Sequence, residues 1–418
     1  MRCEIITIGN ELISGRTLDL NAWYAAEKLT AAGLQVTRIT SIGDDCDQVS
    51  ETLENALKMS QFIIVTGGLG STDDDLTNEI VAKVLNRPLC LDREMFELIR
   101  RHASMQGVAM NPFLEKMAWL PDGSKMLSPE GKACGFSLVE NEARLYFLPG
   151  VPEQMRYLID RIVIPEIRSH CERLPVTREL TLKVFGLSEP RIAEIFEDLR
   201  GRTGKALLGF YPHFPENHIT VTLTDRDHHV VALEMERIEK AIRDRIGPYI
   251  FACGNGSMAE AVGQVLKRRK WTLSVAESCT GGLVGHLLTA VPGSSSYFLG
   301  GIISYSNQAK IDVLRVSPGT LQSAGAVSDE TVREMAEGVR QKLKTDLGIA
   351  ISGIAGPEGG SQEKPVGTVH LGMATVEETF TRKYCFMGSR RQIKRVSAMM
   401  ALDWLRRYCN GDPFLPGL

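Results

Sequence analysis

The chain has 418 residues, which is more than one ordinary hydrophobic core accommodates, so two or three domains are expected. Hydrophobic residues make up 43% and charged residues 24% of the sequence, which fits a globular protein and excludes a disordered or fibrous one. The formal net charge of −3 lacks the basic excess of most nucleic-acid-binding proteins, so a nucleic-acid partner is not expected.

The nine cysteines are scattered and odd in number, and the eight histidines include no His-Glu-x-x-His motif. This pattern argues against a disulfide framework, a zinc ribbon and a zinc hydrolase, and it fits a reducing compartment. The N-terminal apolar run is too short and too acidic for a signal peptide, and no apolar run approaches membrane-spanning length. We therefore expect a cytoplasmic protein without a membrane partner.

The first part of the chain, residues 1–172, alternates short β-rich runs with helical patterns. Strands are expected at 3–8, 34–40, 62–66, 135–139 and 144–148. Helices are expected around Trp23, at 46–59 and at 152–170. This β-α-β-α-β order predicts a mainly parallel sheet covered by helices on both faces.

The middle part, residues 173–253, has a different order of predicted strands and helices. A strand pattern at 179–186 is followed by a helix at 188–196, two strands around Phe210 and Ile219, and an amphipathic helix at 231–246. The order predicts a small α+β domain.

The last part, residues 254–418, again alternates helix and strand, beginning with a helix at 258–269 for which Ser257 is the expected N-cap. Its glycine-rich segments at 276–282, 292–301 and 351–360 fall at predicted strand ends. Ligands of α/β sheets collect beyond the carboxyl ends of strands, so a second site is expected here. The predicted fold class is α/β, with two three-layer α/β domains joined by the small α+β domain.

The segment from Thr66 to Thr77 follows a buried strand and carries three glycines and three consecutive aspartates. Glycines let backbone amides approach an anion, and the aspartates would attract a divalent cation that bridges to a phosphate. The alternative is that Asp73 to Asp75 only cap the following helix. The segment is not a Walker loop, because the Gly-Lys-Ser/Thr end is absent.

Four segments of the first domain together resemble the CinA (competence/damage-inducible protein) family: Gly9-Asn-Glu-Leu-Ile-Ser-Gly, Asn21-Ala-Trp, Gly67-Gly-Leu-Gly-Ser-Thr-Asp-Asp-Asp-Leu-Thr and Leu148-Pro-Gly-Val-Pro-Glu-Gln-Met. The resemblance implies a molybdopterin-binding-like domain that hydrolyses ADP-ribose to AMP and ribose 5-phosphate. It implies potassium and a divalent metal (Mg, Mn or Co) as cofactors. It also makes the middle domain similar to the family's KH-like connecting domain.

The same resemblance assigns site residues in the first domain. The implied metal ligands are Glu11, Asp74 and Asp75. The implied substrate-binding residues are Thr66, Gly67, Gly68, Gly70, Thr72, Thr77, Pro149 and Gly150. Two positions depart from the family pattern, Ser71 in place of proline and Lys132 in place of threonine.

Three segments of the last domain, at 276–282, 292–310 and 352–368, are rich in hydroxyls, lysines and glycines and contain no histidine. A hydrolase built from them would need a base other than histidine, and a desolvated lysine can serve. Cys279 has no histidine nearby in sequence and is more typical of a small buried residue. Thr280 and the two glycines after it suit a phosphate, and Ser278 is a candidate N-cap.

The last domain resembles the CinA C-terminal domain, the nicotinamide mononucleotide (NMN) deamidase family. The segments that carry the resemblance are Glu277-Ser-Cys-Thr-Gly-Gly, Gly293-Ser-Ser, Tyr305-Ser-Asn-x-x-Lys, Gly325-Ala-Val-Ser, Ser352-Gly-Ile-Ala-Gly-Pro, Lys364-Pro-Val-Gly-Thr and Gly388-Ser-Arg. The implied reaction hydrolyses the amide of NMN to nicotinate mononucleotide and ammonia, and it needs no cofactor.

On this resemblance we expect Ser295 as the nucleophile and Lys310 as its base, with Tyr305 and Ser278 completing a proton path or orienting the amide. Without it, residues 294–296 would be interpreted as a polar loop. The expected substrate-binding residues are Glu277, Thr280, Gly281, Gly282, Ser352, Gly353, Gly356 and Arg390.

The leading hypothesis is a nucleotide-recycling hydrolase that acts on NMN and ADP-ribose as a homodimer. One alternative keeps the NMN deamidase and makes the first domain a catalytically silent nucleotide-binding domain. A second alternative is a non-enzymatic accessory protein in competence or DNA damage.

Overall fold

The computed structural model of the chain describes residues 1–127, 133–171, 174–199 and 205–416. The chain folds into two compact units, Met1–Glu179 with Leu223–Glu234, and Leu180–Thr222 with Met235–Leu418. Over the described ranges, no helix combines the length and the apolar character needed to cross a bilayer. All nine cysteines are free.

The first domain is built on a six-stranded sheet with strand order β2-β1-β3-β8-β7-β6. Its first four strands in that order are parallel, whereas β7 and β6 run antiparallel to their neighbours. The strands are β1 (Arg2–Ile8), β2 (Gln35–Ile42), β3 (Phe62–Thr66), β6 (Lys125–Met126), β7 (Phe136–Glu140) and β8 (Ala143–Leu148). Strand β3 is buried at every position because helices cover both faces of the sheet, so its sequence is a continuous apolar run.

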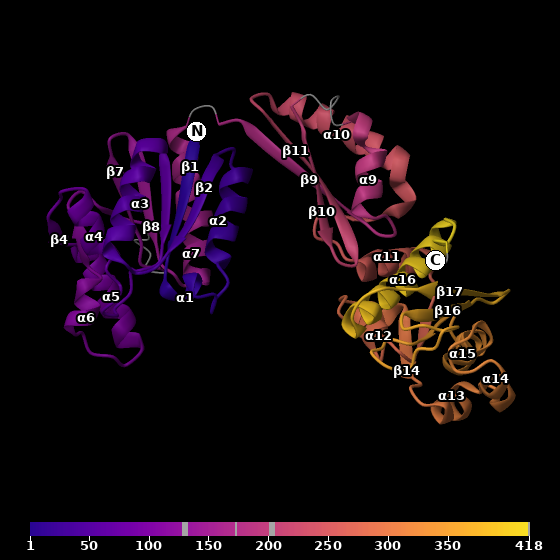
Figure 1. Cartoon of the computed structure of the whole chain (residues 1–418). Helices are drawn as coiled ribbons and strands as arrows, with labels where there is room; N and C mark the ends of the chain where they lie inside the picture. The colour runs from indigo at the N-terminus through magenta and orange to yellow at the C-terminus, as the bar shows by residue number, and fades with distance from the viewer. Residues whose placement is uncertain (128–132, 172–173, 200–204, 417–418) are drawn as a thin grey trace. The chain divides into compact units, whose positions relative to one another are not determined.

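Helices flank this sheet on both faces (Figure 1). One face carries α2 (Leu20–Ala31), α7 (Pro152–Leu158) and α8 (Ile164–His170), and the other carries α3 (Cys46–Met59), α4 (Thr77–Val84) and α5 (Arg93–Met105). In α3, Val49, Leu53 and Ala56 recur at helical spacing and are buried, while Asp45 caps the first turn. The remaining elements are α1 (Asn10–Ile13), β4 (Leu89–Leu91), α6 (Pro112–Lys116), β5 (Trp119–Pro121) and the π-helical turn η1 (Ile159–Val163).

The connecting domain has a four-stranded sheet of order β10-β11-β9-β12, in which β10 pairs antiparallel with β11 and β12 pairs antiparallel with β9. Its elements are β9 (Val176–Val184), α9 (Glu189–Ile195), η2 (Glu197–Leu199), β10 (Leu207–His213), β11 (Glu216–Asp225), α10 (His228–Ile246), η3 (Gly247–Tyr249) and β12 (Ile250–Cys253).

The C-terminal domain has a five-stranded sheet of order β14-β13-β15-β16-β17. Strands β13, β14 and β15 are parallel, and β16 and β17 complete the sheet antiparallel. The strands are β13 (Leu273–Glu277), β14 (Phe298–Ile303), β15 (Leu347–Gly353), β16 (Thr368–Ala374) and β17 (Thr379–Cys385).

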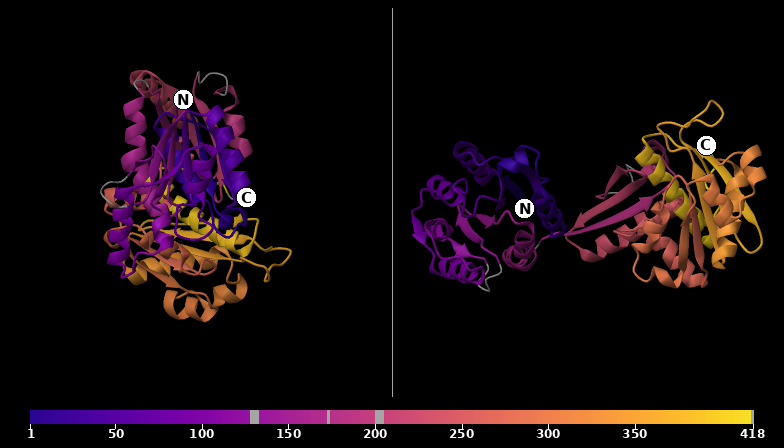
Figure 2. Two further views of the ribbon diagram at one scale, coloured as in Figure 1. Left: turned by 90° about the vertical axis from the view of Figure 1, so that its left-hand side faces the viewer. Right: turned by 90° about the horizontal axis from the view of Figure 1, so that it is seen from below.

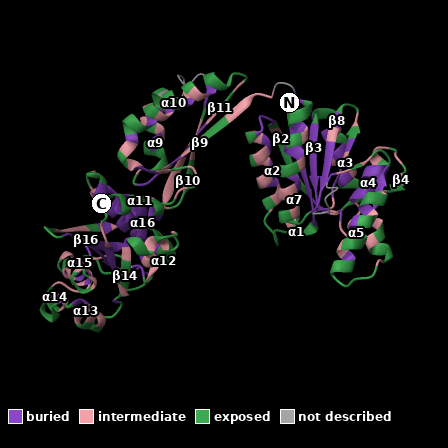
Figure 3. Ribbon diagram, turned by 180° about the vertical axis from the view of Figure 1, so that it is seen from behind, coloured by how far each residue is buried: buried purple, intermediate pink, exposed green. Residues whose placement is uncertain are grey.

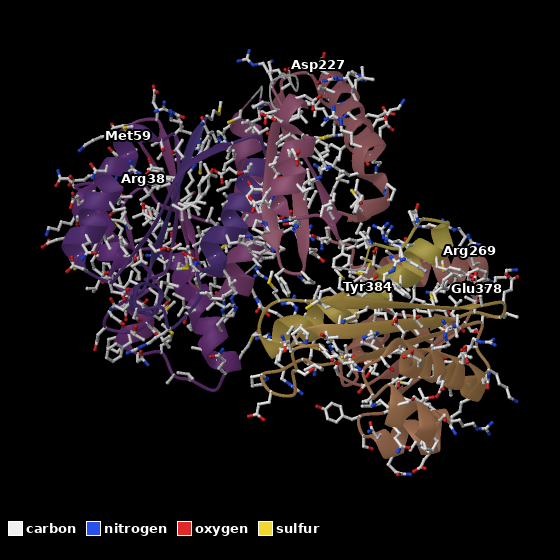
Figure 4. The ribbon with its side chains drawn as sticks, turned by 45° about the vertical axis from the view of Figure 1, so that its right-hand side comes forward. Arg38, Met59, Asp227, Arg269, Glu378 and Tyr384 are labelled. Atoms are coloured by element: carbon white, nitrogen blue, oxygen red, sulfur yellow. The ribbon has the colours of Figure 1, made fainter. Side chains whose placement is uncertain are left out.

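Helices again cover both faces of the C-terminal sheet, and Figure 2 gives two further views of them. One face packs against α11 (Met258–Arg269), α12 (Leu283–Thr289) and α16 (Arg390–Asn410), and the other against α15 (Asp329–Leu343). The smaller helices are η4 (Ser294–Ser296), α13 (Asn307–Leu314) and α14 (Pro318–Ser323). Tyr384, labelled in Figure 4, is fully buried in β17 and accepts a 2.8 Å hydrogen bond from Trp404 Nε1 of α16.

The predicted fold class is confirmed, since the chain has two α/β domains with helices on both faces of their sheets and a small α+β domain between them in sequence. Figure 3 shows buried strands beneath helices whose outer faces are exposed. The predicted N-cap at Ser257 is confirmed as a capping box with Glu260. The helix expected at 152–170 contains the π-helical turn η1. Lys132 and the rest of 128–132 lie outside the described residues.

Candidate functional site

In the C-terminal domain, the turn between β13 and α12 is organised by Glu277, which is 2% exposed. Its carboxylate accepts hydrogen bonds from the backbone amides of Gly282 (2.9 Å), Val284 (3.1 Å) and Gly285 (2.8 Å). Glu277 therefore caps the first turn of α12, because an anionic acceptor satisfies amides that have no partner within the helix. The prediction that Ser278 caps α12 is therefore wrong, and the Glu277 carboxylate bonds to backbone amides, while its contact with a substrate stays a prediction.

Ser278 lies instead beside Lys310, a residue of α13, the helix that follows β14. The Lys310 side chain is 1% exposed, and its Nζ lies 3.1 Å from Ser278 Oγ. Nζ also donates to the backbone carbonyls of Ser304 (2.7 Å) and Tyr305 (3.4 Å). Burial lowers the pKa of Lys310, because a charged ammonium loses hydration in the interior.

These contacts can be made in either protonation state, because an ammonium can donate to all three oxygens. A deprotonated lysine has two N–H donors and one lone pair, and two carbonyls and one hydroxyl surround Lys310 Nζ. The two carbonyls can take both donors, which leaves the lone pair for the proton of Ser278. The arrangement is that of a nucleophile held against its general base.

A cavity of about 280 Å³ opens over this pair. It is lined by seven of the predicted C-terminal site residues: Ser278, Tyr305, Lys310, Ser352, Gly353, Gly356 and Arg390. Arg390 forms one wall by donating to the carbonyl of Gly356 (2.6 Å) and to the hydroxyl of Tyr305 (3.1 Å). Ser352 Oγ donates to the carbonyl of Ala326 at 2.6 Å, so its hydroxyl proton is engaged.

Ser295 is not part of this cavity, and the expectation that it pairs with Lys310 is wrong within one chain. Ser295 lies in η4, directly before β14, whereas Lys310 Nζ bonds to carbonyls directly after β14. The six-residue strand that separates them spans about 20 Å. Ser295 is exposed, and its neighbour Ser296 bonds back to the carbonyl of Gly293, so residues 294–296 form a polar loop.

Cys279 is 5% exposed and packs in the hydrophobic core. Desolvation raises the pKa of its thiol to about 12, so the nucleophilic thiolate is suppressed at neutral pH. The prediction that Cys279 is a packing residue is consistent with this burial.

The turn of Thr280, Gly281 and Gly282, which the sequence suggested for phosphate binding, lies at the edge of a neighbouring cavity. Thr280, Gly281 and Gly282 line a hollow of about 760 Å³ together with basic residues at the start of α16. The glycines have φ values of +61° and +92°, a region that other residues rarely adopt. Sequence analysis named Arg390 here but missed Lys394, four residues further along α16, although side chains at that spacing share one helix face.

In the first domain, a cavity of about 780 Å³ lies beyond the carboxyl ends of β1, β3 and β8. It is lined by nine of the predicted residues: Glu11, Gly67, Gly68, Gly70, Thr72, Asp74, Asp75, Pro149 and Gly150. Thr66 and Thr77 are buried beneath it, donating to the carbonyls of Pro149 (3.0 Å) and Gly67 (3.2 Å). The hydroxyls of these two threonines hold the loops in place, and their contact with a substrate stays a prediction.

The aspartates of this domain form contacts within their own loop. Asp75 Oδ2 accepts from the amide (2.9 Å) and hydroxyl (2.7 Å) of Thr72, and Asp74 also accepts from that hydroxyl. Helix α4 begins at Thr77 without a side-chain cap. The alternative that Asp73 to Asp75 serve only as a helix cap is therefore wrong.

Asp44 is a fourth carboxylate that the sequence did not indicate, and it lines the cavity with Glu11, Asp74 and Asp75. Burial, followed by the negative charges of Asp74, Glu11 and Asp75, raises the pKa of Asp44. The four carboxylates are therefore close enough to repel one another. Within the described residues, no three acidic, histidine or cysteine side chains are already gathered as a metal-binding set. The metal ligands thus stay a prediction.

Comparison with known families assigns all three domains. The sequence models of the probable molybdopterin binding domain, the damage-inducible protein CinA KH domain and the CinA C-terminal domain match residues 4–169, 179–252 and 255–409, respectively.

Full-length relatives match as well. A CinA-like protein of Desulfotalea psychrophila is 39% identical over 99% of this chain and 100% of its own length. A putative competence-damage inducible protein of Halothermothrix orenii is 37% identical over 98% of each chain. The crystal structure of competence damage-inducible protein A from Klebsiella pneumoniae is 35% identical, with a TM-score of 0.35, and covers 36% of this chain and 93% of its own.

Proposed function

Because the chain belongs to the CinA family, we propose that it is a nucleotide-recycling hydrolase whose C-terminal domain deamidates NMN to nicotinate mononucleotide and ammonia. The observation that carries the proposal is the buried contact of 3.1 Å between Ser278 Oγ and Lys310 Nζ. It supplies a nucleophile and a base in the family's C-terminal domain without histidine.

In the proposed reaction, Ser278 Oγ attacks the amide carbon while neutral Lys310 takes the hydroxyl proton. The resulting ammonium gives that proton to the departing nitrogen, so ammonia leaves and an ester to Ser278 remains. Lys310 then takes a proton from water as the water attacks the ester, and it returns that proton to the departing Ser278 Oγ, which releases nicotinate mononucleotide and regenerates the serine hydroxyl and the neutral lysine. Ser278 thus replaces Ser295 as the proposed nucleophile, and Lys310 keeps its proposed role.

The negative charge that develops on the amide oxygen needs donors. The backbone amides of Cys279 and Ala355 line the cavity, and neither has an acceptor from another residue among the described parts of the chain. Both are candidates for an oxyanion hole. Tyr305 and Arg390, linked by their hydrogen bond of 3.1 Å, form the outer wall that would orient the pyridine ring.

For the first domain we propose hydrolysis of ADP-ribose to AMP and ribose 5-phosphate with a divalent cation (Mg, Mn or Co) and potassium. Carboxylate oxygens are the ligands that hard cations prefer, and Glu11, Asp74 and Asp75 would hold the metal with Asp44 in support. The cation would supply charge neutralisation for the pyrophosphate. The glycine backbone of residues 67–70 would approach its oxygens.

A catalytically silent first domain is the alternative that the Ser71 and Lys132 departures favour. A non-enzymatic competence or DNA-damage role is the third candidate, and the names of relatives such as the putative competence-damage inducible protein of Halothermothrix orenii favour it. We further propose a cytoplasmic homodimer, the location on the basis of the nine free cysteines.

One assay separates these candidates. The purified full chain is incubated with NMN and, separately, with ADP-ribose in the presence of each divalent ion and potassium, and ammonia and AMP are scored. Ammonia from NMN and AMP from ADP-ribose are expected. Ammonia alone would indicate the silent first domain, and neither product would reject both hydrolase proposals.

A further inference from the structure

We propose that the hollow between α12 and α16 is the subsite for the phosphate group of the nucleotide, with Lys394, Arg391 and Arg395 as its cationic side chains. The inference rests on the proposed NMN deamidase in that it concerns the phosphate of the same substrate. It makes these residues the ones that distinguish a nucleotide from the corresponding nucleoside.

The hollow has a volume of about 760 Å³ and a strongly basic lining. Helix α16 contributes Arg390, Arg391, Lys394 and Arg395 from its first two turns, and α12 contributes His286. No acidic side chain is among the residues that line it. A doubly charged phosphomonoester matches such a surface.

Arg390 bonds to Gly356 and Tyr305, but the other three cations at the start of α16 have no side-chain partner in the described parts of the chain. Among the described residues, Arg391, Lys394 and Arg395 form no ion pair and no side-chain hydrogen bond. By contrast, the buried arginines of the same helix have an acidic partner, since Arg406 and Arg407 bond to Asp403 at 2.7 Å and 2.6 Å. Cations in the first turns of a helix are also disfavoured by the helix dipole, so this cluster lacks a structural reason.

The buried hydroxyl of Thr280, at the edge of the hollow, lacks a hydrogen-bond partner within the described parts of the chain. Thr280 is fully buried and lines the hollow, and its Oγ1 has no hydrogen-bond partner among the described residues. Leaving a buried hydroxyl unpaired is costly, and a phosphate oxygen could accept its hydrogen bond once a small shift of the turn opens Oγ1 to the hollow.

The hollow adjoins the catalytic turn. A Cβ built on Gly281 would lie 3.5 Å from Lys394 Nζ, so the ammonium sits against the turn that carries Ser278. The positive charge of Lys394 acts on the thiol of Cys279, the residue after Ser278, where it lowers the thiol pKa against the larger effect of burial.

The distance between the two cavities fits a mononucleotide. Ser278 lines one and Thr280 the other, and two residues of chain span at most about 7 Å. Arg390 lines both. The nicotinamide can therefore reach the Ser278–Lys310 pair while the phosphate on its ribose lies between Thr280 and Lys394.

The test compares substrates with and without the phosphate. Lys394→Gln, Arg391→Gln and the double variant are assayed for ammonia release from NMN and from nicotinamide riboside, with Lys342→Gln, an exposed lysine on α15, as the matched control. We expect the KM for NMN to rise about tenfold or more while kcat and all constants for the riboside stay near their starting values. Lys394→Arg should keep most of the affinity.

Direct binding separates this inference from the proposed activity. Inorganic phosphate is titrated calorimetrically into the full chain in the presence of EDTA, which removes the cation proposed for the first domain, and it should bind the unsubstituted protein and the control but not the double variant. This binding measurement gives a result even if NMN is not a substrate. Unchanged phosphate binding in the double variant, or an equal loss of affinity for NMN and for nicotinamide riboside, would overturn the subsite.

Discussion

At the scale of single residues, the C-terminal chemistry depends on which hydroxyl Lys310 can reach. Ser278→Ala should lower ammonia release from NMN by on the order of 10³-fold or more, because nucleophile and base act as a unit. Ser295→Ala should retain near-normal turnover, because Ser295 lies in an exposed loop beyond the far end of β14. Steady-state ammonia release from the two variants is the measurement, and the reverse ranking would restore Ser295 as the nucleophile.

The protonation of Lys310 sets the expected pH dependence. Burial lowers its pKa from 10.5, so the active neutral amine is reached at a lower pH than an exposed lysine would require. The kcat/KM for NMN should rise with pH through this lowered pKa and then level off. Lys310→Arg should be inactive throughout, because guanidinium does not lose its proton in this range. A flat profile for the unsubstituted protein would remove Lys310 as the base.

Sequence analysis predicted most residues of the C-terminal cavity but assigned wrong roles to some of them. Lys310, Tyr305, Ser352 and Arg390 do converge on one cavity. Ser295 fails because it precedes a strand whereas Ser278 follows one, and parallel strands send those positions to opposite edges of the sheet. The role of Glu277 as a cap could not be predicted, because the local turn decides how many backbone amides donate hydrogen bonds to its carboxylate, and composition does not reveal that turn.

At the scale of elements, the start of α12 depends on the Glu277 carboxylate. Glu277→Ala leaves three amides without their acceptor, at a cost of about 1–3 kcal/mol for each one that stays buried. The midpoint of urea unfolding of the C-terminal domain should therefore fall clearly, and NMN deamidation should fall with it. Ser257→Ala, which removes the exposed cap of α11, serves as the comparison and should cost about 1 kcal/mol. Equal effects of the two substitutions would contradict this assignment.

The loop from Thr72 to Asp75 can be tested without disturbing its shape. Asparagine keeps an oxygen that accepts from Thr72 but carries no charge, so the Asp74→Asn/Asp75→Asn variant should stay folded. It should lose ADP-ribose hydrolysis through weaker cation binding and keep NMN deamidation. AMP and ammonia release are measured side by side. ADP-ribose hydrolysis at the original rate would reject the metal assignment of this loop.

At the scale of the whole molecule, the alternation of strand and helix patterns was sufficient to predict both α/β domains and the smaller domain between them in sequence. The loops that line the two cavities follow the carboxyl ends of β1, β3 and β8 in one domain and of β13, β14 and β15 in the other, where parallel strands bring their following loops together, whereas the predicted segment 292–301 precedes and enters β14. Asp44 escaped prediction because it belongs to the site only through tertiary proximity to a loop distant in sequence, whereas the helical spacing of Lys394 from Arg390 could have indicated it.

The two sites differ in chemistry, so they should respond differently to chelation. Four carboxylates line the cavity of the first domain, whereas the proposed deamidase mechanism uses only a serine, a lysine and backbone amides. EDTA should therefore abolish AMP release from ADP-ribose and leave ammonia release from NMN unchanged in the same preparation of the full chain. Adding back a divalent ion should restore only the first activity. Deamidation that is lost on chelation and recovered with the ion would show that the C-terminal site also depends on a metal, and the division of chemistry between the domains would then be wrong.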